Sequence, residues 1–198
     1  MEYIEIDGCK VTVNLIETCL NLMVKGTPLL FVGPAGVGKT MLARRLAALR
    51  GGPFRAPHHT VSIVGLTGSA RYPTGGECAR ANRGVLFLDE MPEFTRQALD
   101  VIKAAYLDKE VSNYDRELKT HVGVTTDFYL IGASNACPCG WRGHSTRKCD
   151  CSGDMVVRYH DRAKSFAQSV GFTRIGISTY LSQELPVMCH TPAFDSYI

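Results

Sequence analysis

The sequence predicts an α/β fold in which helices pack on both sides of a parallel sheet. Three apolar runs, at 29–32, 85–88 and 128–133, have the length and composition of strands that are buried on both faces. Segments with helical periodicity separate these runs, and strands that alternate with helices form parallel sheets. A glycine-rich loop follows the first run and polar residues follow the other two, at the carboxyl ends of the strands, where parallel sheets bind their ligands.

The composition is typical of a globular protein with a sizeable core. Of the 198 residues, 45% are hydrophobic and 21% charged, and the net charge of +3 does not by itself indicate a nucleic-acid partner. Residues 1–7 do not begin a secretory signal, and no apolar run could span a bilayer. We therefore expect a cytoplasmic protein with its eight cysteines reduced or metal-bound, one domain over 1–185 and a loose tail over 186–198.

The first third of the chain is expected to hold one edge strand and two helices. Residues 1–8 have the apolar content of a short edge strand, and residues 13–24 have the apolar spacing of a mostly buried helix. Gly26 is a plausible cap for that helix. A second helix over 39–50 carries an apolar stripe and is stopped by Gly51 and Gly52.

The middle and last thirds alternate irregular and regular segments. Residues 53–84 are rich in Gly, Pro, His and Thr and predict a long irregular insertion with room for a short hairpin or helix. Pro92 and Glu93 are predicted to open a helix. Charged and β-branched residues over 110–126 predict a β-hairpin, and the spacing of apolar residues over 154–170 predicts a helix with a basic exposed face.

A phosphate-binding loop is predicted directly after the first apolar run. The spacing Gly-x-x-x-x-Gly-Lys-Thr lets successive backbone N–H groups surround phosphate oxygens at a helix N-terminus. In such a loop the lysine reaches the β- and γ-phosphates and the threonine hydroxyl contacts Mg²⁺. A glycine-rich turn without a ligand is the alternative, but strand, spacing, Lys-Thr and helix occur together. The loop consists of Gly33, Pro34, Ala35, Gly36, Val37, Gly38, Lys39 and Thr40.

Polar residues at the ends of the other two runs complete the predicted catalytic set. Asp89 is expected to hold Mg²⁺ directly or through water, and Glu90 to polarise the attacking water. The alternative for these acids is a helix start that favours negative charge. Asn135 follows the third run and is predicted either to orient the same water or to cap the chain locally, and the residues alone leave both open.

Two cysteine pairs bracket a polar, basic loop. Cys137, Cys139, Cys149 and Cys151 could supply the four thiolates of a tetrahedral Zn²⁺ site. The Cys-x-Cys spacing is less usual than Cys-x-x-Cys, so free reduced thiols remain the alternative.

Two further clusters have a structural and a functional interpretation. Basic residues gather after the third run, where a solvated face is the commoner meaning and salt-sensitive DNA contact the functional one; they are Arg142, Arg147, Lys148, Arg158, Arg162 and Lys164. For His58 and His59 no metal-binding partner is visible in the sequence, and a structural or pore-loop role is favoured.

Four segments of the chain resemble one family of ATPases. They read Gly-Pro-Ala-Gly-Val-Gly-Lys-Thr-Met-Leu-Ala from Gly33, Phe-Arg-Ala-Pro-His-His-Thr-Val-Ser from Phe54, Gly-Val-Leu-Phe-Leu-Asp-Glu-Met-Pro-Glu-Phe from Gly84 and Ser-Asn-Ala-Cys-Pro-Cys-Gly from Ser134. This order resembles the magnesium-chelatase-like AAA+ ATPases, and within them the ComM (YifB) competence-protein branch, from about residue 29 to residue 162.

The resemblance implies a three-layer αβα P-loop NTPase core that uses ATP and Mg²⁺. It also implies activity as a hexameric ring and, in the ComM branch, branch migration on DNA. The segment 33–40 matches Walker A, Asp89 with Glu90 matches Walker B, and Asn135 matches the sensor-1 residue.

The resemblance extends to other segments, with some departures. Residues 53–84 resemble an insertion that projects toward the ring pore, and 110–126 resembles the hairpin before sensor 1. Arg174 resembles the arginine finger that reaches a neighbouring subunit's nucleotide, although Thr173 and Gly176 stand where the family has acids. No helical lid pattern follows residue 180 and the family's N-terminal domain is missing, so we expect an isolated core without a lid.

Three functions follow from these observations. The first is a DNA-directed, ATP-hydrolysing ring motor. The second is a truncated module that binds nucleotide without hydrolysing it, because its lid and finger are incomplete. The third is a chelatase-type subunit that drives metal insertion through a partner, and it ranks lower because the Cys-Pro-Cys-Gly and His-His segments look more like the ComM branch.

Overall fold

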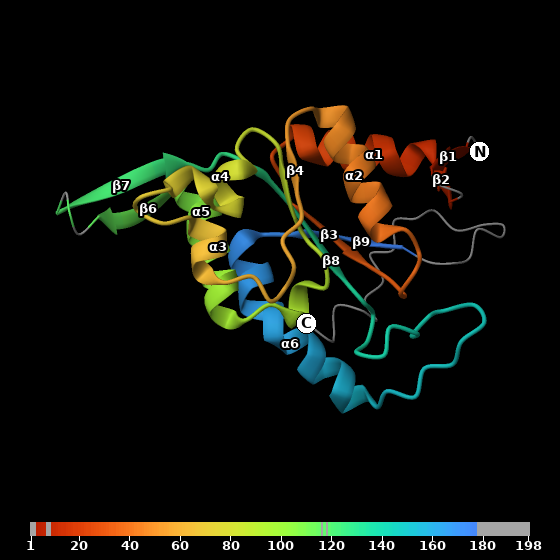
Figure 1. Cartoon of the computed structure of the whole chain (residues 1–198). Helices are drawn as coiled ribbons and strands as arrows, with labels where there is room; N and C mark the ends of the chain where they lie inside the picture. The colour runs from red at the N-terminus through yellow and green to blue at the C-terminus, as the bar shows by residue number, and fades with distance from the viewer. Residues whose placement is uncertain (1–2, 7–8, 116, 118, 178–198) are drawn as a thin grey trace.

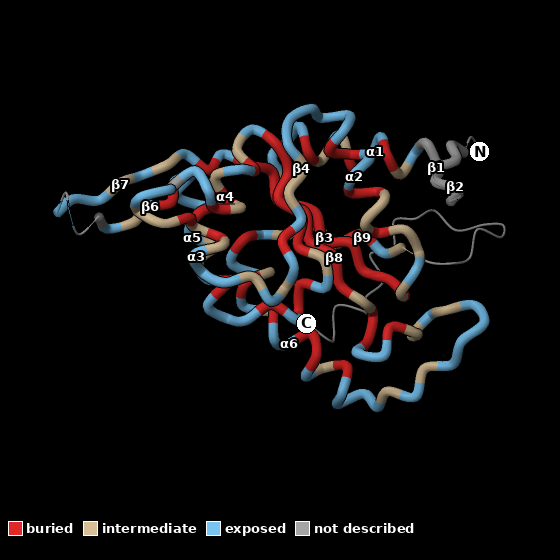
Figure 2. The backbone as a smooth tube through the Cα atoms, in the orientation of Figure 1, coloured by how far each residue is buried: buried red, intermediate tan, exposed pale blue. Residues whose placement is uncertain are grey.

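The computed structural model of the chain describes residues 3–6, 9–115, 117 and 119–177. Within these residues a parallel sheet of five strands runs through the centre of the molecule, and its three inner strands appear in red in Figure 2 because they are buried. The α/β prediction is therefore confirmed. In spatial order the strands are β4 (Phe54–Arg55), β5 (Val85–Leu88), β8 (Tyr129–Ser134), β3 (Leu29–Val32) and β9 (Thr173–Gly176).

Helices cover both faces of this sheet, as Figure 1 shows. One face packs against α1 (Val13–Val24) and α2 (Lys39–Arg50) through alternate strand residues such as Phe31 and Phe87. The other face packs against three helices through the intervening residues, such as Leu30 and Leu86. This alternation follows from the two-residue period of a strand and gives the expected αβα layers. The three helices are α3 (Ile63–Thr67), α5 (Arg96–Asp108) and α6 (Gly153–Val170).

The two outermost strands were not predicted from the sequence. β4 contains two half-buried residues, and in β9 only Ile175 is buried. Neither has the continuous apolar run that marks a strand covered on both faces. Thr173 and Arg174 are paired with Leu29 and Leu30 of β3, so β9 extends the sheet beyond β3.

The segment 53–84 is more regular than the sequence predicts. After β4 it forms α3, a 3₁₀ turn η1 (Pro73–Gly75) and α4 (Glu77–Arg80). Arg55 donates two hydrogen bonds to Glu77, Nε to Oε2 at 2.7 Å and an Nη atom to Oε1 at 2.6 Å, which join the two ends of the excursion. Buried Leu66 and Cys78 anchor it to the core.

An antiparallel hairpin lies over 110–126, as expected. It consists of β6 (Glu110–Asp115) and β7 (Thr120–Thr125), and it extends away from the rest of the molecule in Figure 1. Its base is fixed to α5, because the hydroxyl of buried Thr126 donates to the carbonyl of Ala105.

Two predicted boundaries need correction. Pro92 opens only a 3₁₀ turn, η2 (Met91–Glu93), and α5 begins at Arg96, where the Thr95 hydroxyl accepts a hydrogen bond from the Ala98 N–H and caps the helix. The first strand is not an edge of the central sheet, because β1 (Tyr3–Ile6) and β2 (Cys9–Thr12) pair with each other as a separate hairpin. The predicted tail, 186–198, and the region after residue 180, where we expect no lid, lie outside the described residues.

Candidate active site

The phosphate loop joins a buried strand to a helix N-terminus, as expected. β3 ends at Val32 and α2 begins at Lys39, so 33–38 forms the turn between them. Gly36 and Gly38 have φ angles of 77° and 87°, a left-handed backbone that residues with a Cβ rarely adopt. The first N–H groups of α2 lack helical partners and carry partial positive charge, so this turn is suited to an anion.

Lys39 connects the phosphate loop to the end of β8. Its side chain is buried, and Nζ donates to the carbonyls of Gly33 and Pro34 at 2.9 and 2.7 Å and to Oδ1 of Asn135 at 2.9 Å. Burial lowers the pKa of Lys39 to about 8, against the opposing effects of Asp89 and Glu90. The structure thus brings together four predicted site residues that follow the ends of the neighbouring strands β3 and β8.

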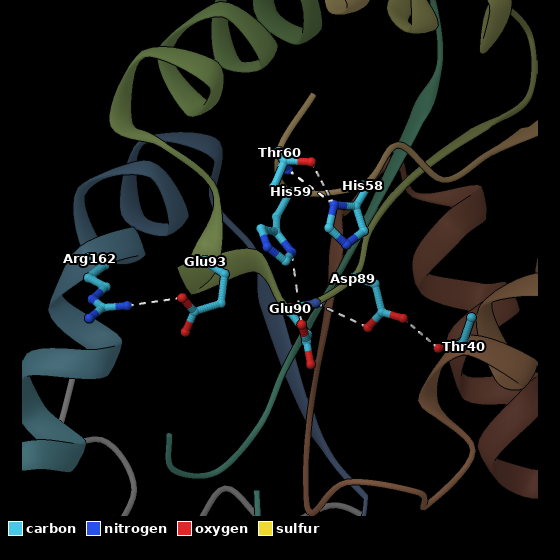
Figure 3. Close-up of polar contacts among 8 residues, drawn as sticks. All are labelled: Thr40, His58, His59, Thr60, Asp89, Glu90, Glu93 and Arg162. Carbon is cyan, nitrogen blue, oxygen red and sulfur yellow. Dashed lines mark hydrogen bonds and ion pairs between the residues drawn. The ribbon is translucent and has the colours of Figure 1, made fainter. Parts of the chain in front are cut away.

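Thr40 and Asp89 form the second contact across the site. The Thr40 hydroxyl donates to Oδ2 of Asp89 at 2.8 Å, as Figure 3 shows. Asp89 is fixed from its other side because Oδ1 accepts the backbone N–H of Glu90 at 3.1 Å. A hydroxyl and a carboxylate at this separation are hard oxygen donors of the kind that Mg²⁺ prefers.

Glu90 is the most accessible acid of the group. Its backbone is left-handed, with φ of 51°, and 52% of its side chain is exposed. Nδ1 of His59 lies 3.9 Å from Oε2 of Glu90, and the rings of His58 and His59 lie against each other (Figure 3).

The contact between His59 and Glu90 was not predicted from the sequence, which separates the two residues by a long segment. The signal that could have revealed it is position, because Ala56-Pro-His-His follows β4 just as Asp89-Glu90 follows the neighbouring β5. Residues that follow adjacent parallel strands lie at the same edge of the sheet.

Arg174 is not placed in this group. It is half-buried in β9, opposite Leu30 of β3, and therefore on the face of the sheet that α6 covers. Burial lowers the pKa of His160 on α6, and the nearby charge of Arg174 lowers it further. A residue that acts on a neighbouring subunit need not lie beside its own phosphate loop, so its assignment as a finger remains a prediction.

The four clustered cysteines come together in the loop between β8 and α6. All four Sγ atoms lie within 4.8 Å of one another. α6 buries the apolar stripe that the sequence predicts and leaves Arg158 and Arg162 exposed. Arg162 donates to Glu93 at 3.1 Å, so part of the basic face has an acidic partner within the chain (Figure 3).

No helix among the described residues has the length and apolar character needed to cross a membrane.

The fold resembles that of NtrX from Brucella abortus. The structure in complex with ADP has a TM-score of 0.55 at 18% sequence identity and covers 85% of this chain and 36% of that chain. The structure in complex with ATP gives a TM-score of 0.54, also at 18% identity, with 84% and 36% covered. At this identity the comparison supports the αβα P-loop fold alone.

Sequence comparison identifies closer relatives. The uncharacterized protein YifB of Escherichia coli is 31% identical over 166 residues, which cover 69% of this chain and 32% of YifB. Competence protein ComM of Haemophilus influenzae is 34% identical over 163 residues, which cover 68% of this chain and 31% of ComM. The chain therefore spans about a third of the length of these relatives.

The family match covers much of the site. A model of the family described as magnesium chelatase, subunit ChlI, matches residues 47–167, more than half of the chain. The matched region contains Asp89, Glu90, Asn135 and the four clustered cysteines, and the phosphate loop precedes it. With its αβα P-loop fold and its similarity to YifB and ComM, the chain belongs to the magnesium chelatase subunit ChlI family of AAA+ proteins.

Proposed function

We propose that this chain binds ATP with Mg²⁺ and hydrolyses it, as the ATPase core of a hexameric ring that acts on DNA in the cytoplasm. The observation that carries the proposal is the pair of contacts Lys39–Asn135 and Thr40–Asp89. Together they gather a cation, an amide, a hydroxyl and a carboxylate around a loop suited to phosphate.

The phosphate loop binds the triphosphate in this proposal. Backbone N–H groups of 33–40 surround the phosphate oxygens, and Lys39 exchanges neutral carbonyl acceptors for charged β- and γ-phosphate oxygens, which form stronger hydrogen bonds. Thr40 and Asp89 hold Mg²⁺, directly or through its water molecules. Bound Mg²⁺ neutralises charge that develops on the β- and γ-phosphates.

Glu90 and Asn135 act on the attacking water. The exposed carboxylate of Glu90 accepts a proton from that water as it attacks the γ-phosphorus, and the leaving group is ADP. Asn135 orients the water from the end of β8, where its Oδ1 already accepts from Lys39.

The assembly and the DNA substrate are argued from Arg174, the relatives and the basic residues. Arg174 is proposed as the finger that completes a neighbouring subunit's site, which makes hydrolysis depend on oligomerisation. DNA is favoured because one relative is named a competence protein, and because exposed Arg147, Lys148 and Arg158 can contact phosphates.

Two other functions have an observation in their favour. A module that binds nucleotide without hydrolysis is favoured by Thr173 and Gly176, which stand beside Arg174 where the family has acids. A subunit that drives metal insertion into a tetrapyrrole through a partner protein is favoured by the description of the matching family as magnesium chelatase. Hydrolysis that is stimulated by branched DNA would exclude the module without hydrolysis and disfavour the metal-insertion subunit.

The test is to measure ATP binding and hydrolysis in Glu90→Gln. Loss of the general base should lower hydrolysis by about 10²-fold or more, while Mg²⁺–ATP still binds because the amide keeps the shape of the side chain. Lys39→Ala should lose binding itself. Glu93→Gln is the matched control, because Glu93 lies three residues away and pairs with Arg162 rather than with the site. An unchanged rate in Glu90→Gln would refute the proposed role of Glu90.

A further inference from the structure

We propose that Cys137, Cys139, Cys149 and Cys151 bind one Zn²⁺ ion, and that this ion holds the loop between β8 and α6 against the phosphate loop. These thiols make none of the nucleotide contacts proposed above, and they belong to no step of the proposed reaction. The four side chains nevertheless meet in space although a polar stretch separates the two pairs.

The spacing of the sulfur atoms fits a single tetrahedral ion. Sγ of Cys137 lies 3.3 Å from Sγ of Cys139 and 3.6 Å from Sγ of Cys149, and Cys139 and Cys149 are separated by 3.7 Å. A Zn–S bond of about 2.3 Å gives about 3.8 Å between the sulfurs of a regular tetrahedron. With all four sulfurs within 4.8 Å of one another, the space suits one ion rather than a multi-iron cluster.

The surroundings favour Zn²⁺ bound to thiolates. Soft sulfur ligands select Zn²⁺ over the hard cations Mg²⁺ and Ca²⁺. Four thiolates around Zn²⁺ leave a charge of −2, and the same loop supplies Arg142, Arg147 and Lys148. The backbone N–H of Arg142 donates to Sγ of Cys137 at 3.3 Å, a contact that stabilises a thiolate and orients it as a ligand.

The loop has little else to hold it in place. From Asn135 to Ser152 it contains no helix or strand, and most of its side chains are exposed or half-buried. Its aromatic residue, Trp141, packs against Arg147 and His144 of the same loop. A long irregular segment whose side chains are mostly exposed or half-buried needs a cross-link to have one conformation, and a structural zinc site supplies folding free energy of this kind.

The same loop contacts the nucleotide site directly. The carbonyl of Gly140 accepts the backbone N–H of Ala35 in the phosphate loop at 2.8 Å, and a Cβ on Gly140 would lie 3.1 Å from the Cβ of Ala35. Asn135, which accepts from Lys39, is only two residues before Cys137. On the other side, His160 of α6 contacts the carbonyl of Ala136 at 3.4 Å. Zn²⁺ at the cysteines therefore fixes the loop that contacts the phosphate loop through Gly140 and α6 through Ala136.

The metal site is tested first, on the full chain purified under reducing conditions. Metal analysis should find about one zinc per chain. Replacement with Co²⁺ should give the intense visible absorption of tetrahedral cobalt thiolate. Cys149→Ser should lose most of the metal after brief chelation, whereas Cys19→Ala, which removes a buried thiol of α1, should keep it. Reduced protein without metal, or a Cys149→Ser variant with full zinc, would overturn the site.

The link to the phosphate loop is tested by ATP binding, and this step rests on the proposed nucleotide function. Removal of zinc from the parent chain with a chelator should weaken ATP binding by roughly tenfold, and zinc added back should restore it. Circular dichroism before and after chelation shows whether the chain stays folded without zinc, which separates a local effect on the phosphate loop from unfolding. Equal ATP affinity with and without zinc would overturn the link. Absence of ATP binding in the zinc-loaded parent would instead refute the proposed function and leave the metal result standing.

Discussion

The three hydrogen bonds of Lys39 go to neutral oxygen atoms, two from carbonyls and one from the amide of Asn135. A buried ammonium among neutral acceptors is less favourable than the same group in water, which is why burial lowers its pKa to about 8. The negative phosphates of ATP favour the charged form. Binding of ATP should therefore raise the pKa of Lys39 and couple affinity to pH.

We predict that ATP affinity falls as the pH rises through about 8, by up to tenfold for each further pH unit, with one proton taken up on binding above that pH. The sign follows because the free chain loses the proton of Lys39 in this range, whereas the complex keeps it. Calorimetry in buffers of different ionisation enthalpy measures the uptake. In Lys39→Arg the guanidinium stays charged, so the same pH slope in this variant would contradict the assignment to Lys39.

The sequence is informative about the site where spacing alone defines a role. Gly33–Thr40 and the acids at 89 and 90 could be identified because a strand, a turn of fixed length and a helix must occur together. The contact of His59 with Glu90 could not be identified from the sequence. His59 follows a different strand, and only the order of strands in the sheet brings it near Glu90. Spacing likewise cannot show that two Cys-x-Cys pairs converge.

Among the elements, the β6–β7 hairpin depends on its attachment to α5. The carbonyl of Ala105 lies in the last turn of α5, where helical partners run out, and the hydroxyl of Thr126 satisfies it. Thr126 is almost fully buried, so water cannot replace this contact. The hydrogen bond therefore joins the end of a helix to the end of the hairpin.

Thr126→Val should destabilise the chain by about 1–2 kcal/mol, because it leaves the buried carbonyl of Ala105 without its hydrogen bond while the side chain keeps its shape. Thr125→Val is the matched control: Thr125 is exposed, and the change should stay within about 0.5 kcal/mol. Urea unfolding of both variants measures the free energies. Equal stabilities would show that the hydroxyl does not anchor the hairpin.

Strand prediction succeeded or failed according to burial. β3, β5 and β8 are buried at every residue and stand out as apolar runs. β4 is too short and too exposed to give such a signal, and β9 has only one buried side chain. The start of α5 was misplaced because Pro92 is compatible with the first turn of either an α-helix or a 3₁₀ turn.

For the whole molecule, the proposed ring makes activity a property of the assembly. If Arg174 completes the site of a neighbouring subunit, ATP turnover per chain should rise with protein concentration and then level off as rings form. Arg174→Ala should lower turnover by about 10³-fold without loss of ATP binding. Arg158→Ala, an exposed arginine of α6, is the control and should keep the parent rate when both are measured without DNA. Turnover that is independent of concentration would contradict the ring, and an active Arg174→Ala would contradict the finger.

The ion pair of Arg55 and Glu77 has a mechanical consequence. Its two hydrogen bonds hold together the two ends of segment 55–77, which contains His59 and α3. These ends cannot move apart unless both bonds break. In this segment, Ile63 and Val64 are exposed on α3, and Nδ1 of His59 lies 3.9 Å from the carboxylate of Glu90, outside the segment. A displacement of α3 should therefore reach His59, beside Glu90, through only the three residues 60–62 that separate them.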